Sequence, residues 1–302
     1  TCILWFTVKW RPRLVFSLKA VKSLFSFGWK LLASSLLNEL YVNLRTLIIG
    51  RVFSPTMLGF YNRGQQFPQF IVTNIDGSIQ AVMLPTLSAH QNDIKRVREM
   101  VRRSIVTSSF IMFPMMVGLA VIAEPLVKLL LTEKWSPAVP FLQLFCVQYA
   151  IMPIHTANLQ AINALGRSDI FLKLEVIKKI VGITIILVTL PYGIYALAVG
   201  SVIGDLLGSF INAYPNKKLL NYSYLDQLKD IMPSILLSFG MGFTVYMVRV
   251  IALPSRLILL LQITIGIIFY IGCAHAIKLE SFYYLKATIF DLIKNRKRKE
   301  AL

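Results

Sequence analysis

The sequence predicts an all-α, polytopic membrane protein with about eight transmembrane helices. Of its 302 residues, 56% are hydrophobic, and the mean hydropathy is +0.65. Soluble domains typically contain about 45–50% apolar residues. The apolar residues fall in blocks of about 20, which is enough to cross a hydrocarbon core roughly 30 Å thick. The expected spans are 27–52, 54–88, 104–121, 138–165, 169–190, 195–214, 231–251 and 257–277.

Local signals place several of these boundaries. Ser54 followed by Pro55 is typical of a helix start, so we expect the second span to begin there. That span contains an unusually polar stretch at 63–68, which predicts an interruption. Ser168 is expected to cap the fifth span, and Pro191 is expected to help end it.

The distribution of cations predicts the orientation. The net charge is +18, but the cations gather between the apolar blocks, so the basicity reflects topology and not nucleic-acid binding. Since cytoplasmic loops carry the excess of Lys and Arg, we expect both ends of the chain on the cytoplasmic side. Of the 32 Lys and Arg residues, 25 lie in the segments expected there, which are 9–30, 91–103, 167–179, 216–230 and 278–302.

Motifs of enzymes are absent from the sequence. The three histidines, His90, His155 and His275, lie far apart, and no glycine-rich phosphate loop is present. The three cysteines have neither metal-ligand nor disulfide-framework spacing. We therefore expect no catalytic residues, no metal and no cofactor, and we favour transport over enzymatic activity.

The first span carries a polar face. At 100° per residue its polar side chains fall within an arc of roughly 160°, opposite a face of leucines. Two explanations stay open: the face lines an aqueous cavity, or its polar groups join neighbouring helices. Two opposite charges on one face favour the cavity. The polar residues are Ser35, Asn38, Glu39, Asn43, Arg45 and Thr46.

Arg45 is the strongest single candidate for a functional residue. It lies roughly 9 Å from the helix end near Arg51, too deep for an easy interfacial position. Its guanidinium could hold a phosphate through paired, charge-assisted hydrogen bonds. Arg63 and Asp76 in the second span are weaker candidates, since Arg63 could equally lie at the outer interface.

Further polar residues lie in the fourth to sixth spans. Lys178 and Lys179 are roughly 15 Å along the fifth span, so they either attract phosphate or are ordinary interfacial cations paired with Glu175. His155 and Asn158 follow Pro153 in the fourth span. His155 could be a proton site or a hydrogen-bonded helix contact, and Asp205 in the sixth span is a similar case.

Three runs of the sequence resemble a known family. They are 25–68, 123–135 (AEPLVKLLLTEKW) and 153–179 (PIHTANLQAINALGRSDIFLKLEVIKK). Together they are similar to the Wzx-type polysaccharide or O-antigen flippases. These belong to the multidrug, oligosaccharidyl-lipid and polysaccharide exporter superfamily, and the colanic-acid branch, of lipopolysaccharide biosynthesis exporters, looks nearest. The similarity extends over nearly the whole chain.

The resemblance implies a transporter with two six-helix lobes around a central cavity and extra helices at the C-terminus. On that basis the chain is a C-terminal part of a longer protein and would not transport alone. We expect residues 1–10 to end an upstream helix and 11–215 to form the C-terminal lobe. Residues 216–279 would add two transmembrane helices, and 280–302 would form a basic amphipathic cytoplasmic tail.

The resemblance also implies an activity. A Wzx-type protein would move undecaprenyl-diphosphate-linked oligosaccharide across the bacterial inner membrane by alternating access, driven by a gradient of H⁺ or Na⁺. Its partners would be that substrate, the coupling ion, membrane lipid, the N-terminal lobe, and polysaccharide polymerases or glycosyltransferases, but no nucleic acid. In this interpretation Arg45, Arg63, Lys178 and Lys179 are substrate-binding cavity cations, Glu39 and Asp76 serve ion coupling, and Asn38, Asn43, His155 and Asn158 line the cavity.

Three alternatives remain at the level of sequence. A drug or small-molecule exporter of the same superfamily is disfavoured because the spans hold more cations than carboxylates. A polysaccharide ligase or polymerase would need a large periplasmic loop, and the outer loops here are short. A non-catalytic lipid-binding scaffold stays open, because no motif reports energy coupling.

Overall fold

The computed structural model describes residues 17–250, 255–288 and 290, and within these residues it is helical, with no strand. This confirms the predicted all-α class. The principal helices are α2 (Leu18–Val52), α3 (Pro55–Ala89), α4 (Ile94–Val121), α5 (Ala123–Leu131), α6 (Val139–Ala150), α7 (Met152–Ala164), α8 (Ser168–Thr189), α9 (Ile194–Ala213), α10 (Asn216–Leu219), α11 (Tyr224–Met247) and α12 (Ser255–Ala276).

Side-chain caps account for several helix starts. Ser54 accepts a hydrogen bond from the backbone amide of Met57, 3.1 Å away, and Pro55 is the first residue of α3, as predicted. Asp93 caps α4, and Ser223 forms a capping box at the start of α11. At α8 the expectation was wrong by one residue, because Ser168 is already inside the helix.

Five helical stretches of the described chain are long and apolar enough to cross a membrane, against about eight expected. They are Ile94–Val121, Glu133–Ala164, Ile194–Leu219, Tyr224–Val250 and Arg256–Ala276. The other three expected spans correspond to α2, α3 and α8, which have 35, 35 and 22 residues. These helices are long enough to span the bilayer, but they carry the polar side chains that build the site described below.

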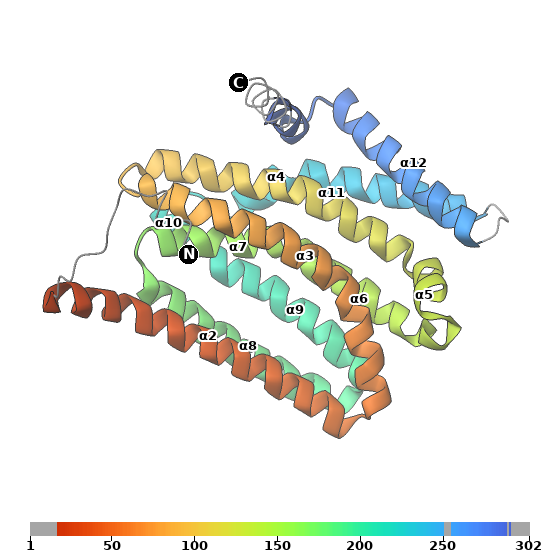
Figure 1. The fold of residues 1–302 in the computed structure, drawn as a ribbon, viewed down its shortest axis with the longest axis horizontal. Coiled ribbons are helices and arrows are strands. Elements are labelled where there is room, and N and C mark those ends of the chain that lie inside the picture. The colour runs from red at the N-terminus through yellow and green to blue at the C-terminus, as the bar shows by residue number, and fades with distance from the viewer. Residues whose placement is uncertain (1–16, 251–254, 289, 291–302) are drawn as a thin grey trace, which may run out of the picture.

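The predicted interruption at 63–68 is wrong. Helix α3 runs unbroken from residue 55 to residue 89, although Pro68 and Pro85 lie inside it. Its course is bent (Figure 1), as expected where a proline removes a backbone hydrogen bond. The fourth expected span is divided instead, since α6 ends before Ile151 and α7 begins at Met152.

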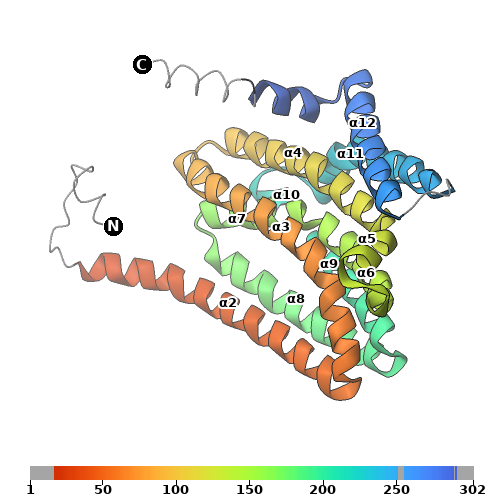
Figure 2. The same cartoon turned by 45° about the vertical axis from the view of Figure 1, so that its right-hand side comes forward.

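The helices form two groups around α3. Helices α3, α4, α6 and α7 share the main apolar core, α11 packs on α4, and α12 packs on α11. Helix α2 packs mainly on α8, which in turn packs on α9. In the views of Figures 1 and 2, α2 and α8 lie on one side of the molecule and α11 and α12 on the other.

Large apolar side chains cover the outward faces of α8, α11 and α12. Examples are Ile180, Leu236 and Ile267, all more than half exposed. A water-soluble monomer rarely exposes apolar surface on this scale. These faces therefore suit contact with lipid, as expected of a multi-pass membrane protein.

Some of the expected divisions fall partly outside the described residues. The upstream helix end at 1–10 lies wholly outside them, as do residues 11–16 of the expected lobe. Of the basic tail, residues 280–288 form a helical segment, named here the C-terminal helix, and residues 291–302 lie outside the description.

An ion-pair cluster joins the end of α11 to α5. Glu124 lies 2.5 Å from the Arg249 guanidinium and 3.2 Å from the Lys128 ammonium. These two cations hold the pKa of Glu124 below its ordinary value, so this carboxyl is charged at neutral pH. The cluster fixes α5 to the turn that follows α11, at the end of the molecule opposite the basic segments of α4 and α10.

Gly64 allows close approach between α3 and α6. A Cβ atom at this position would lie 2.6 Å from the Cβ of Phe141 and 2.8 Å from the backbone nitrogen of Leu142. We predict that Gly64→Ala destabilises the protein by about 1–3 kcal/mol through overpacking. Gly59, where an added Cβ meets nothing within 4 Å, is the matched control, and Gly59→Ala should be neutral or stabilising. Thermal unfolding in detergent measures both, and equal melting temperatures would contradict the predicted packing.

Candidate functional site

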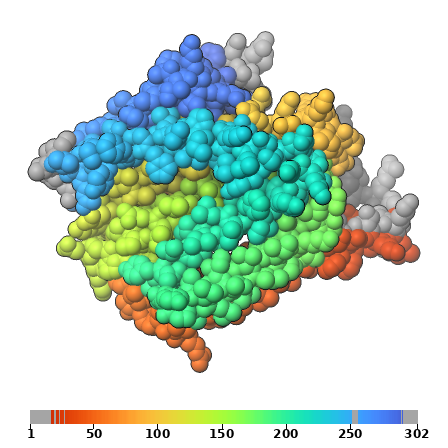
Figure 3. Space-filling view, turned by 180° about the vertical axis from the view of Figure 1, so that it is seen from behind, coloured from red at the N-terminus to blue at the C-terminus, as the bar shows by residue number. Residues whose placement is uncertain are grey.

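A polar cavity of about 600 Å³ lies among six helices, α2, α3, α6, α7, α8 and α9. Both charged and amide side chains line it. A narrow gap between the green surface of α8 and the teal surface of α9 is visible from behind (Figure 3). The principal polar lining residues are Asn38, Glu39, Arg45, Asp76, Gln148, His155, Glu175, Lys178, Lys179 and Asp205.

A charged cluster on α8 connects this helix to α2. Glu175 lies 2.5 Å from Lys178 and 3.7 Å from Lys179. The ammonium of Lys179 also donates to the amide oxygen of Asn38 at 2.7 Å and lies 4.7 Å from the ring centre of Tyr41. Both lysines line the cavity, and their side chains are only 17% and 16% exposed.

Arg45 faces the same cavity from α2. Its guanidinium donates to the hydroxyl of Tyr61 on α3 and lies 5.4 Å from the centre of that ring. The Nε of Arg45 is buried without a hydrogen-bond partner among the described residues. An unpaired buried donor carries a desolvation cost, which an anion in the cavity would relieve.

His155, Asp205 and Gln148 form the wall on the side of α7 and α9. Gln148 donates to the Asp205 carboxylate at 2.6 Å. The Nε2 of His155 lies 3.1 Å from the backbone oxygen of Asp205, and its Nδ1 lies 2.9 Å from the amide nitrogen of Asn212. A neutral imidazole satisfies both contacts when Nε2 carries the proton.

Asp76 lies in the wall formed by α3 and α7. Thr156 donates to its Oδ2 at 2.7 Å. The other carboxylate oxygen, Oδ1, is buried and has no partner in the described part of the chain. A carboxylate with one free buried oxygen is able to take a proton or a cation. No group of three or more His, Cys, Asp or Glu side chains is placed to hold a metal ion in the described ranges.

The structure brings together seven of the ten predicted site residues. In the cavity lining are Asn38, Glu39, Arg45, Asp76, His155, Lys178 and Lys179. Asn43, Arg63 and Asn158 lie elsewhere. Sequence reasoning left Gln148 out of the site and gave Asp205 only a minor place. The only sequence signal for the part of the wall formed by Gln148 and Asp205 was that Asp205 is an acidic residue within an apolar span.

Asn158 does not line the cavity, and the expectation that it does is corrected. It is fully buried and its amide donates to Gln227 on α11 at 2.7 Å. Its side-chain oxygen accepts from Gln227 at 3.0 Å and from Asn216 at 2.6 Å. This closed network of amides joins α7 to α10 and α11, so Asn158 has a structural position.

Asn43 and Arg63 are both exposed on the outside of the lobe. Asn43 donates to the backbone oxygen of Glu39 within its own helix, at 2.8 Å. Arg63 donates to Gln66 at 2.6 Å and lies 5.4 Å from the ring centre of Trp135. Neither side chain turns toward the cavity, because each points to the other side of its helix.

Arg63 lies beside a row of exposed polar side chains on α3. At 100° per residue, Asn62, Gln66, Gln69 and Thr73 fall within an arc of roughly 60°, and all are exposed. We name these four residues the α3 polar stripe. Arg63 lies next to the stripe, as does the exposed apolar Phe70. A row of amides along a membrane-length helix is costly against hydrocarbon.

Comparison with known proteins shows which proteins this chain resembles. Residues 1–140 match the family described as "Polysaccharide biosynthesis protein". The chain is 29% identical over 245 residues to the lipopolysaccharide biosynthesis protein WzxC of Escherichia coli (strain K12), covering 77% of this chain and 49% of that protein. It is 28% identical over 246 residues to the teichuronic acid biosynthesis protein TuaB of Bacillus subtilis (strain 168), covering 79% and 50%. The chain is thus similar to proteins named for polysaccharide biosynthesis.

The fold of this chain is shared with a solved structure, "Lipid II flippase MurJ, inward closed conformation". The TM-score is 0.70 at 17% sequence identity, and the match covers 95% of this chain and 59% of the other. The chain spans about half the length of the curated relatives it matches.

We predict that Asn158→Ala destabilises the protein by about 1–3 kcal/mol, because the buried amide of Gln227 loses its partner and that of Asn216 keeps only the backbone oxygen of residue 158, at 3.3 Å. Asn43→Ala, which removes only an exposed bond within one helix, should leave stability nearly unchanged. Thermal unfolding of both variants in detergent checks this. Equal melting temperatures of the two variants would contradict a stabilising role of the buried amide network.

Proposed function

We propose that this chain forms one lobe of a two-lobed transporter that moves undecaprenyl-diphosphate-linked oligosaccharide from the cytoplasmic to the periplasmic leaflet of the bacterial inner membrane. The observation that carries the proposal is the α3 polar stripe. Four exposed polar residues in line on a 35-residue helix need water or a protein partner. A second lobe facing α3 across an aqueous cavity supplies both.

The lengths of the relatives support a second lobe. The chain covers only 49% and 50% of the two relatives compared above. A transporter with binding sites between its two halves moves its substrate by exposing them alternately to either side. Alternating access by this chain therefore depends on a partner lobe, and one lobe alone would not close the pathway.

The cations have different roles in this proposal. Arg63 lies beside the α3 polar stripe and would meet the diphosphate in the central cavity. Arg45, Lys178 and Lys179 line the inner cavity of the lobe and would attract the diphosphate once α2 and α8 separate. Arg45 is the best placed of the three, because it has a buried donor without a partner and no carboxylate within 4.0 Å among the described residues.

Ion coupling would use the carboxylates of the same cavity. Asp76 has one unpartnered buried oxygen, whereas Glu39 is exposed at the edge of the cavity. We propose that Asp76 takes H⁺ or Na⁺ and that Glu39 lies on its path of entry. Replacing the carboxylate of Asp76 or Glu39 with a neutral group would change the electrostatic potential at the Arg45 guanidinium.

The relatives also favour polysaccharide precursors over drugs as the transported class. Two matched proteins are named for lipopolysaccharide and teichuronic acid biosynthesis, and a third is the "Succinoglycan biosynthesis transport protein ExoT" of Rhizobium meliloti (strain 1021). Their names describe the making of surface polymers. This supports a transporter in polysaccharide assembly, not an enzyme or a drug exporter.

Complementation of a flippase-deficient bacterium tests the proposal. The chain is joined to the N-terminal half of a close relative, and surface polysaccharide is measured. We predict that Arg45→Ala lowers the amount by about tenfold or more, since charge-assisted hydrogen bonds to phosphate are lost. The matched control is Arg51→Ala, on the same helix, exposed and outside the cavity lining.

The chimera and its two variants are compared at equal amounts of protein in the membrane. An active chimera with an active Arg51→Ala variant and an inactive Arg45→Ala variant supports a cationic transport cavity. Full activity of the Arg45→Ala chimera would reduce Arg45 to a packing residue and remove the proposed substrate contact.

A further inference from the structure

A second cavity lies on the other side of the molecule. Its volume is about 360 Å³, and it separates the first half of α4 from the turn and the C-terminal helix that follow α12. The C-terminal helix does not continue the direction of α12 but passes beside α4 (Figure 2). From α4 the lining includes Arg102, Arg103 and Thr107, and from the C-terminal segment Lys278, Glu280 and Ser281.

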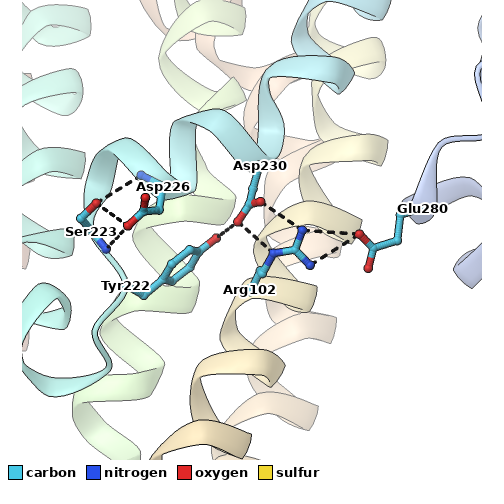
Figure 4. Close-up of polar contacts among 6 residues, drawn as sticks. All are labelled: Arg102, Tyr222, Ser223, Asp226, Asp230 and Glu280. Atoms are coloured by element: carbon cyan, nitrogen blue, oxygen red, sulfur yellow. Dashed lines mark hydrogen bonds and ion pairs between the residues drawn. The ribbon is translucent and has the colours of Figure 1, made fainter.

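A network of ion pairs holds this cavity together (Figure 4). Arg102 donates to both carboxylate oxygens of Asp230 on α11, each at 3.0 Å, and to Glu280 at 3.4 and 3.5 Å. Tyr222 donates to Asp230 at 2.7 Å. Arg102 thus shares its single positive charge between Asp230 and Glu280, and Glu280 is the one carboxylate in the lining.

Two cations of the lining remain without an acidic partner. Neither Arg103 nor Lys278 has a carboxylate within 4.0 Å among residues 17–250, 255–288 and 290. Arg103 lies 4.7 Å from the ring centre of Tyr284, which orients its guanidinium. Lys278 occupies a left-handed turn with φ 55°, which directs the chain from α12 into the C-terminal helix. Arg102, Arg103 and Lys278 against Asp230 and Glu280 leave one positive charge in excess, which suits an anion.

Free hydrogen-bond donors accompany these cations. Ser281 is only 4% exposed, lines the cavity, and has no hydrogen-bond partner for its hydroxyl within the described residues. The backbone amides of Phe282 and Tyr283 bond to Leu279. The amides before them, in the first turn of the helix, have no acceptor inside the helix. A phosphate group accepts hydrogen bonds from donors of this kind.

The site lies where lipid headgroups are found. Helix α12 ends at Ala276, and Lys278 follows within two residues. Tyr283 and Tyr284 are each 39% exposed, and tyrosine is typical of the membrane interface. Ile277, an exposed apolar side chain next to the site, offers a surface for acyl chains.

We propose that this cavity binds the phosphate of an anionic phospholipid, such as phosphatidylglycerol or cardiolipin. The diphosphate of a lipid-linked substrate has the same chemistry. The phospholipid fits better, because the site faces away from α2, α8 and the polar cavity (Figures 1 and 2). Basic pockets between transmembrane helices are known to bind such headgroups. The bound lipid would fix the C-terminal helix against α4.

Native mass spectrometry of the purified chain in detergent, titrated with phosphatidylglycerol, tests this proposal. The test variant combines Arg103→Ala with Lys278→Asn, because asparagine tolerates a left-handed turn. We expect about tenfold weaker binding, the change for losing charge-assisted hydrogen bonds. The matched control is Lys286→Ala, on the same helix, exposed and outside the cavity lining.

Further arms distinguish the sources of the phosphate. Phosphatidylcholine and undecaprenyl diphosphate are titrated in parallel, and Ser281→Ala serves as a milder second variant in case the double variant does not fold. The site is supported if the test variants selectively lose binding of phosphatidylglycerol while the control variant binds it as tightly as the unchanged chain does. Unchanged phosphatidylglycerol binding, an equal loss in the control, or a loss confined to undecaprenyl diphosphate would overturn it.

Discussion

The cost of placing charged and amide groups in a membrane governs this structure. An ionisable side chain inside the bilayer is expensive unless it meets a partner, water or protein. Helices α2, α3 and α8 carry most of these groups, and they are the three long helices that fall outside the five clearly apolar stretches. Their polar faces either turn inward together, as Lys179 does toward Asn38, or remain exposed as the α3 polar stripe.

This arrangement divides the molecule into a part held together by apolar packing and a part held mainly by polar contacts. Apolar packing joins α3, α4, α6 and α7, and the buried amides around Asn158 tie α7 to α10 and α11. Helices α2 and α8 contact each other more than they contact this core, and polar contacts such as those of Arg45 and Lys179 link them to their neighbours. Polar contacts of this kind exchange for water or a ligand more readily than packed apolar surface, which suits α2 and α8 to movement in the proposed transport cycle.

The sequence was sufficient to predict the class, most span positions and the cap at Ser54, because these depend on local hydropathy and local chemistry. It also placed Asn38, Glu39 and Arg45 on one face of α2, and these three line the polar cavity, whereas Asn43 of the same predicted face does not. It was not sufficient for Asn158, since the period of a helix does not say which helix will lie opposite. The continuity of α3 through Pro68 also depends on tertiary packing, here at Gly64. Gln148 and Asp205 meet across 57 residues, a contact that no spacing rule predicts.

In the proposed two-lobed transporter the α3 polar stripe faces water. The accessibility of a cysteine at residue 73 tests this position. The protein used is the chain joined to an N-terminal lobe, with its native cysteines replaced by serine. The Thr73→Cys variant of this protein is treated with a water-soluble thiol reagent. Ile267→Cys, on the apolar face of α12, is the comparison. We predict rapid labelling at residue 73 and little at residue 267, since only the former would lie in water. Labelling as slow at residue 73 as at residue 267 would contradict it.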